Sequence, residues 1–239
     1  FYHTERCIMR LDKFLSNQGI ASRSQIKEYI KKGRVMVNQQ IVKNADCQIQ
    51  ENTDTIYFDN QLISYQKNMY IMMNKPQGVV SATKDNLHPT ALELLPDIPV
   101  KDLFFVGRLD LDTEGFLLIT NDGALSHNLL SPKKHVDKTY QVCLSKPLTK
   151  EQIVELEAGV DIGESRLTLP SKVQVITDTE IFLTIMEGKF HQVKRMLKAV
   201  DNEVLFLKRI SIGGVVLDES LNPGEYRFLT EKEIAILLS

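Results

Sequence analysis

A charged loop between two short apolar runs is the feature that most constrains the fold of this chain. The loop, 107–115, carries Arg108 and Asp110 and lies between the apolar runs 103–106 and 116–119. Short apolar runs bounded by turn residues predict buried strands. We therefore expect Asp110 between two strands, where a carboxylate beside Arg108 would suit a nucleophile or a base. On spacing alone, an exposed ion pair without a catalytic role is the commoner alternative, because loops rich in Asp and Gly are frequent.

Length and composition indicate a globular protein. The 239 residues are 43% hydrophobic, which is enough for a sizeable core in one large or two unequal domains. No apolar run could span a bilayer and no signal-peptide pattern opens the chain, so we expect a soluble, cytoplasmic protein without a membrane partner. Residues 1–8 precede Met9, a natural start, and are interpreted as an extension. The cysteines Cys7, Cys47 and Cys143 are far apart, which argues against a disulfide framework or a cysteine-based zinc site.

Basic residues are concentrated near the beginning of the chain. The whole chain has a net charge of −2, yet segment 9–44 contains only two acidic residues, Asp12 and Glu28. Its eight basic residues are Arg10, Lys13, Arg23, Lys27, Lys31, Lys32, Arg34 and Lys43. This asymmetry is typical of an accessory module that binds a polyanion, although a solvated basic helix face explains the charge equally well.

The first sixty residues read as a small domain of helices followed by a sheet. The expected elements are helices over 10–18 and 22–32, a hairpin over 35–42 and a strand over 55–58. Gly19 and Gly33 are placed to end the two helices. We assign 9–60 to this domain and place the boundary in the polar link 59–68.

The remaining residues, 69–239, read as a second domain in which strands alternate irregularly with short helices. Strands are expected over 70–73, 79–82, 136–144, 173–175, 181–185, 204–207 and 210–217, and helices over 91–95, 123–130, 149–158, 187–197 and 230–238. Phe190 and Val193 belong to the expected buried stripe of helix 187–197. This order predicts an α+β fold rather than a regular parallel array.

Two further places could carry chemistry. Tyr140 lies in an alternating strand, where its ring could cover a base and its hydroxyl could move a proton. A core tyrosine is the alternative. His191, Lys194 and Arg195 lie near the start of the helix expected over 187–197, where a phosphate would be favoured.

Other classes of site fit less well. The glycine fingerprints of dinucleotide-binding and P-loop proteins are absent from the sequence. A metal site built from Asp110, Asp112, Glu114 and Asp122 would support phosphoryl chemistry on nucleic acid. Its spacing fits no calcium loop, and Arg108 would oppose a cation, so we expect no metal.

The N-terminal domain resembles the αL RNA-binding module of ribosomal proteins, often called the S-four domain. Segments 10–15, 21–24 and 32–38 carry the resemblance. It implies a grip on folded RNA in which phosphate contacts give affinity with little sequence choice. The expected contacts are Arg10, Lys13, Arg23, Lys27, Lys31 and Arg34.

Four motifs together resemble the RsuA/RluB/RluE/RluF family of pseudouridine synthases, and the chain looks most like its RsuA branch. The motifs are 74–78, 107–115, 138–140 and 188–196, and the resemblance covers 9–238. It implies a mixed, mainly antiparallel sheet in two halves with a central cleft, and isomerisation of a uridine in ribosomal RNA, for RsuA the small-subunit 16S RNA. The alternatives are a 23S enzyme and a non-catalytic RNA-binding or ribosome-assembly factor on the same fold.

The resemblance also implies residue roles. Asp110 would be the catalytic aspartate, Tyr140 the aromatic residue against the base, and Lys194 the cation paired with Asp110. Arg108 would contact the backbone or a phosphate near the flipped nucleotide. Independently of these implied roles, we expect Lys75, His191 and Arg195 to contact the substrate or RNA. Phe190, Lys189 and segment 114–116 differ from common family residues, and none of these differences removes a reacting group. Isomerisation neither oxidises nor hydrolyses, so no cofactor is expected. The expected protein is a monomer that acts on ribosomal RNA within a small-subunit assembly intermediate.

Overall fold

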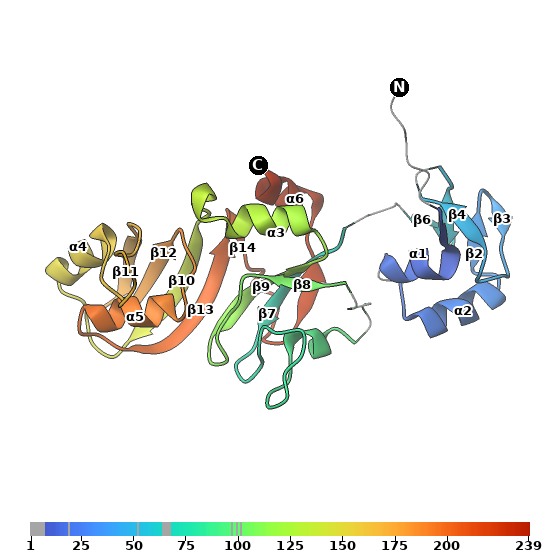
Figure 1. Cartoon of the computed structure of the whole chain (residues 1–239). Coiled ribbons are helices and arrows are strands. Elements are labelled where there is room, and N and C mark those ends of the chain that lie inside the picture. The colour runs from blue at the N-terminus through green and yellow to red at the C-terminus, as the bar shows by residue number, and fades with distance from the viewer. Residues whose placement is uncertain are drawn as a thin grey trace, which may run out of the picture. The chain divides into compact units, whose positions relative to one another are not determined.

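The computed structural model describes residues 8–18, 20–51, 53–63, 68–96, 98, 100 and 102–239. The chain divides into two compact units, Phe1–Met69 with Leu95–Leu103, and Tyr70–Leu94 with Phe104–Ser239 (Figure 1). The extension expected at 1–8 (except Ile8), the helix end at Gly19 and link residues 64–67 lie outside the described residues. Within the described ranges, no helix has both the length and the apolar character needed to cross a membrane.

The first unit contains two helices and two small sheets. Its elements are α1 (Leu11–Asn17), α2 (Arg23–Lys31), the paired strands β1 (Ile8–Arg10) and β4 (Gln48–Gln50), and a sheet in the order β3 (Gln40–Ile41), β2 (Val35–Val37), β5 (Ile56–Phe58), β6 (Gln61–Ile63). Ser22 and Gln25 form a capping box that fixes the start of α2. The apolar helix faces predicted from the spacing are buried against the sheet, at Leu11, Phe14, Leu15, Ile26 and Ile30.

The second unit is built on one long mixed sheet. The strand order is β11 (Lys172–Thr177), β12 (Glu180–Ile185), β10 (Lys138–Leu144), β13 (Val204–Ile212), β9 (Glu114–Thr120), β7 (Tyr70–Lys75) and β15 (Tyr226–Phe228), with β14 (Val215–Val216) on β13 and β8 (Phe104–Val106) on β9. All these pairings are antiparallel except that of β13 with β9. The parallel pairing joins two antiparallel halves, which confirms the predicted mixed, mainly antiparallel sheet in two halves.

Gly115 makes that junction possible. It pairs with Arg209 of β13 and has a φ of 102°, a conformation that favours glycine. A Cβ at this position would lie 2.2 Å from the backbone oxygen of Arg209. The two halves can therefore meet at this register only because residue 115 has no side chain.

Helices cover the sheet. The helices of this unit are α3 (Gly123–Leu130), α4 (Lys150–Ala158), α5 (Gln192–Ala199) and α6 (Glu231–Leu238), and Figure 1 shows α3 beside α6, and α4 and α5 near β10–β12. Leu125 and Leu129 of α3 and Leu237 of α6 share a core cluster with Phe116 and Leu118 of β9. The strand that follows the charged loop is thus fixed by a buried core.

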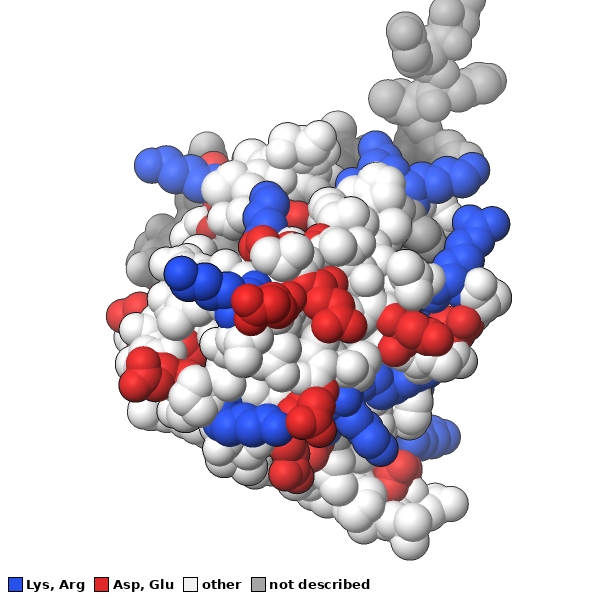
Figure 2. Space-filling model, turned by 90° about the vertical axis from the view of Figure 1, so that its left-hand side faces the viewer, with Lys and Arg blue, Asp and Glu red and all other residues white. Residues whose placement is uncertain are grey.

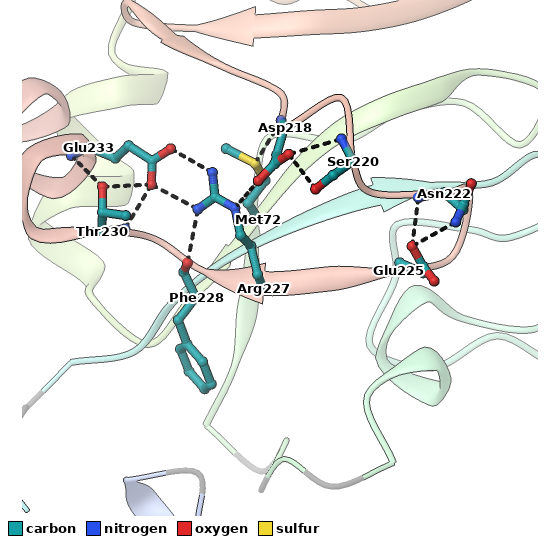
Figure 3. Close-up of polar contacts among 9 residues, drawn as sticks. All are labelled: Met72, Asp218, Ser220, Asn222, Glu225, Arg227, Phe228, Thr230 and Glu233. Carbon is teal, nitrogen blue, oxygen red and sulfur yellow. Dashed lines mark hydrogen bonds and ion pairs between the residues drawn. The ribbon is translucent and has the colours of Figure 1, made fainter.

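Arg227 connects the end of the chain to this core. Its guanidinium binds the carboxylate of Asp218 at 2.6 Å and that of Glu233 in α6 at 2.8 Å (Figure 3). The hydrogen bond from Arg227 lowers the pKa of Glu233 to about 2, and bonds from Ser220 and Arg227 lower the pKa of Asp218 to about 2. These ion pairs tie β15, α6 and the loop after β14 together.

Three element predictions are wrong in detail. Segment 79–82 is not a strand; only Val80 forms a bridge, to Thr90. The strands expected over 204–207 and 210–217 are one continuous strand, β13, followed by a turn at 213–214 and β14. The helix expected over 187–197 begins only at Gln192, so Phe190 lies outside it and is 70% exposed rather than buried.

Candidate active site

The charged loop before β9 and the start of α5 meet at an ion pair. Nζ of Lys194 lies 3.1 Å from Oδ2 of Asp110, and both side chains are 26% exposed. The same ammonium donates a hydrogen bond to Oδ1 of Asp112 at 2.6 Å. Nε2 of His191 lies 3.5 Å from Oδ1 of Asp110. Sequence positions far apart thus form one cluster of two carboxylates and two basic groups.

The cluster stabilises its own charges. Partial burial lowers the pKa of Lys194, but hydrogen bonds to Asp112 and Asp110 outweigh this, and the net pKa is raised. The hydrogen bond from Lys194 lowers the pKa of Asp112. Lys194 therefore stays protonated at neutral pH and provides positive charge beside Asp110.

The backbone on both sides of Asp110 is held by the turn after β7. Oγ of Ser81 accepts a hydrogen bond from the amide of Leu109 at 3.1 Å and donates one to its carbonyl oxygen at 3.2 Å. The amide of Gly78 donates to the carbonyl oxygen of Leu111 at 2.8 Å. Asp110 thus lies between two residues whose backbones are fixed, and its carboxylate is presented in a defined direction.

The side chain of Lys75 stabilises the turn after β7 through hydrogen bonds to its backbone. Its ammonium donates to the carbonyl oxygens of Pro76 at 2.8 Å and Val79 at 2.7 Å, and the side chain is fully buried. Burial lowers the pKa of Lys75 to about 8, against the field of Asp112, Asp110 and Glu114. The expectation that Lys75 contacts RNA does not fit this placement, because the ammonium is turned inward to satisfy backbone carbonyls.

Tyr140 lies opposite a buried arginine that sequence reasoning missed, and this arginine binds β9. Tyr140 is buried on β10, directly opposite Arg209 of β13, so their side chains share one face of the sheet. Arg209 is 2% exposed; its Nε donates to the carbonyl oxygen of Phe116 at 2.8 Å, and its Nη2 has no partner among the described residues. Within those residues no hydrogen bond joins Tyr140 to Asp110.

The segment before α5 is fixed by a buried glutamine. Oε1 of Gln192 accepts from the amide of Lys189 at 2.9 Å, and Nε2 donates to Glu187 at 2.9 Å. His191 adopts a left-handed conformation, with φ 48°, immediately before the helix. Its ring stacks on Phe190, with centroids 3.8 Å apart and 20° between the planes.

The predicted RNA contacts of this unit differ in their availability. Arg195 donates to Glu164 at 2.9 Å and to the carbonyl oxygen of Phe190 at 3.0 Å, so it has structural partners. Arg108 is exposed. On the face that includes α4 and α5, Figure 2 shows Lys and Arg intermixed with Asp and Glu rather than gathered into one basic surface.

The basic residues of the first unit also fall into two groups. Arg10 and Arg23 pair with the buried carboxylate of Asp12, and Arg10 also pairs with Asp46. Arg34 pairs with Asp59 at 2.8 Å through Nε and lies over the rings of Tyr29 and Phe58. By contrast, Lys13, Lys27 and Lys31 are exposed, and their one ion-pair contact within the described ranges joins Lys31 to Glu28 at 4.0 Å.

A metal site has little support in the arrangement of donors. Among the described residues, no three His, Cys, Asp or Glu side chains are grouped to hold an ion. Lys194 also occupies the position between Asp110 and Asp112 that a cation would need.

Fold and site together define an RNA-modifying protein of a known class. Residues 69–199 match the RNA pseudouridylate synthase family and residues 9–54 match the S4 domain. The chain belongs to this family, and the predicted membership, fold class and enzyme class are confirmed.

Similar proteins agree with this assignment. The chain is 49% identical, over 96% of its length and 98% of the relative, to the uncharacterized RNA pseudouridine synthase YtzG of Bacillus subtilis. It is 45% identical to ribosomal small subunit pseudouridine synthase A of Escherichia coli K12, over 95% of this chain and 99% of that protein. A solved pseudouridylate synthase structure matches with a TM-score of 0.68 and 43% identity, over 96% of this chain and 99% of that one.

Proposed function

We propose that this protein isomerises a uridine of small-subunit ribosomal RNA to pseudouridine, with Asp110 acting on the sugar of a flipped-out nucleotide. The observation that carries the proposal is the ion pair between Asp110 and Lys194 within this fold. The small-subunit substrate rests on the relatives of that name, which are 45% identical to this chain in Escherichia coli and Vibrio cholerae.

The reaction explains why one ionised carboxylate is needed. The bond from the sugar to the ring nitrogen breaks, the uracil rotates while it is held, and a ring carbon then bonds to the sugar. Nothing is oxidised or hydrolysed, so the site must exclude water rather than supply it. Asp110 acts either as a nucleophile at the anomeric carbon or as a base that removes a sugar proton, and both roles require its ionised form.

Lys194 keeps that form available. A carboxylate in a partly buried site is disfavoured unless a cation compensates its charge. The ammonium 3.1 Å away does this without a metal ion. Asp112 shares the same cation at 2.6 Å, which fixes the position of the lysine.

Other residues hold the nucleotide. We assign to Tyr140 a stacking contact with the detached uracil and a part in removing the proton from its ring carbon. Arg108, which is exposed beside Asp110, contacts a phosphate or the backbone near the flipped nucleotide. Flipping costs a few kcal/mol, less in a loop or loosened stem, and RNA-backbone contacts offset it.

The first unit of the fold contains the S4 domain and is called the S4 unit from here on. It supplies many of those contacts. Lys13, Lys27, Lys31 and Arg23 are exposed on it, and such residues bind phosphates with little sequence choice. We place the protein in the cytoplasm as a monomer that acts on RNA in a small-subunit assembly intermediate.

The test is to map pseudouridine in ribosomal RNA with and without this protein, and then with the Asp110→Asn variant. We expect one small-subunit position to depend on the protein, and Asp110→Asn to abolish modification while RNA affinity stays within a few-fold. A protein-dependent position in large-subunit RNA would favour the 23S alternative. A wild-type protein that binds RNA and modifies nothing would favour an assembly factor, and full activity of Asp110→Asn would end the catalytic assignment.

A further inference from the structure

Phe190 has a large apolar side chain that is exposed to solvent, so it does not contribute to the hydrophobic core. The residue is 70% exposed, two positions before α5, and the only ring it contacts among the described residues is that of His191. The rest of the segment is not loose. Arg195 binds its carbonyl oxygen at 3.0 Å, and Gln192 binds the neighbouring amide of Lys189 at 2.9 Å.

A single residue, His191, lies between the exposed ring of Phe190 and the carboxylate of Asp110. The face of the His191 ring lies against Phe190, while its Nε2 edge lies 3.5 Å from Oδ1 of Asp110. His191 adopts a left-handed conformation immediately before α5, and its side chain contacts both neighbours. The rings of His191 and Phe190 thus form a stack. The His191 end contacts Asp110, and the Phe190 end is exposed to solvent.

We propose that this Phe190–His191 stack is a binding subsite for a nucleobase adjacent to the target uridine. The inference rests on the proposed function. When a uridine leaves a base stack, its neighbour loses a stacking partner, and the exposed face of Phe190 offers a replacement within reach of Asp110. A flat, uncharged aromatic face is sequence-tolerant, because every base has a π-face. The subsite therefore strengthens binding of RNA in the flipped state and does not select a sequence.

The chemistry favours a base over a phosphate at Phe190. A phenyl ring has no hydrogen-bond donor for an anion, and the guanidinium of Arg195, which binds the carbonyl oxygen of Phe190, is already bound to Glu164 and to the carbonyl oxygen of Ile162 as well. An exposed phenylalanine can stack on a nucleobase. Replacing such a stacking side chain by alanine weakens nucleic-acid binding by roughly five- to a hundredfold.

The first test compares single variants on the shortest RNA that the wild-type protein converts. Phe190→Ala and Phe190→Leu should weaken RNA binding at least fivefold, whereas Phe190→Tyr, which keeps the ring, should bind like wild type. Thermal stability should not change, because the side chain is exposed. Leu205→Ala removes an apolar side chain of similar exposure on β13 and should leave binding unchanged. If Phe190→Leu binds as tightly as Phe190→Tyr, aromatic stacking is refuted.

The second test asks whether the partner is a base. The nucleotides on either side of the mapped uridine are replaced in turn by abasic residues, and each RNA is titrated with wild type and with Phe190→Ala. At one position the abasic replacement should weaken wild-type binding and have little further effect on Phe190→Ala. Independent, additive losses at both positions would overturn the subsite. Conversion by wild type, measured in parallel, separates this failure from a failure of the proposed function.

Discussion

Nζ of Lys194 lies 3.1 Å from Oδ2 of Asp110, so the first turn of α5 supplies the cation for a carboxylate on the loop before β9. The two segments lie beside different halves of the sheet, and the strand pairing that joins these halves is the parallel one of β13 with β9. The distance between Asp110 and Lys194 therefore depends on how the two halves of the sheet are joined, so neither half alone could form the site.

Replacing Lys194 should impair the chemical step more than binding. We expect Lys194→Met to lower kcat about 100-fold, which is typical when one preorganised charge is removed from a site. Lys194→Arg should retain more activity. Lys198→Met, an exposed lysine on the same helix, is the control, and equal losses in both methionine variants would contradict the pairing.

Ser81 should be a positioning residue for Asp110. Ser81→Ala removes both hydrogen bonds to Leu109 and leaves buried backbone groups without a side-chain partner, which costs about 1–3 kcal/mol of stability. We expect kcat to fall about tenfold with little change in KM. Ser171→Ala removes a comparable buried bond, to the carbonyl oxygen of Leu156, away from the loop. If Ser171→Ala lowers kcat equally, the effect of Ser81 is general destabilisation.

Gly115→Ala should disrupt the junction between the halves. A methyl group 2.2 Å from the backbone oxygen of Arg209, at a φ of 102°, forces β9 and β13 apart. We expect a loss of roughly 3 kcal/mol or more in the free energy of unfolding, measured by urea titration. Gly123→Ala, in the first turn of α3 with open space around it, is the control and should be neutral or slightly stabilising.

Local patterns predicted much of the fold because each depends on neighbouring residues. The apolar spacing that identified α1 and α2 is the face that is buried in the first unit. The prediction failed where tertiary contacts overrode local character. Lys208 and Arg209 broke the apolar pattern of β13, yet Arg209 is buried because it binds the carbonyl oxygen of Phe116. Ser81 lies in a segment that looked like a strand, and its hydroxyl instead binds Leu109.

The candidate site likewise contains features that could be predicted from the sequence and features that depend on tertiary contacts. The resemblance predicted that Lys194 pairs with Asp110, and the two groups are in contact. Direct RNA contact was also expected of Lys75, whose burial depends on carbonyl oxygens that only the folded turn brings together. The exposure of Phe190 could not be read from helical spacing, because the helix begins at Gln192, five residues later than the expected start at 187.

The Arg227 cluster should make stability sensitive to acid. The pKa of Glu233 is about 2 in the folded protein against an ordinary value of 4.5, so its stabilising contribution is complete above pH 4.5 and is lost as pH falls toward 2. For this one carboxylate the loss is on the order of 2 kcal/mol. Unfolding titrations at several pH values should show that Glu233→Gln is less stable than wild type at pH 6 and closer to it at pH 2.5. A constant difference across that range would contradict the assignment.

The exposed lysines of the S4 unit should set the salt dependence of RNA binding. We expect the triple variant Lys13→Ala, Lys27→Ala, Lys31→Ala to bind more weakly and to reduce the slope of log affinity against log salt by about 2, because each lost phosphate contact lowers it by roughly 0.7–0.9. The single-turnover rate at saturating protein should change little, since none of the three lies in the catalytic unit. The control removes Lys146, Lys150 and Lys172, which are also exposed but lie in the other unit. If this control flattens the salt dependence as much as the S4 variant does, net charge rather than a local phosphate grip governs binding, and the role assigned to these lysines is wrong.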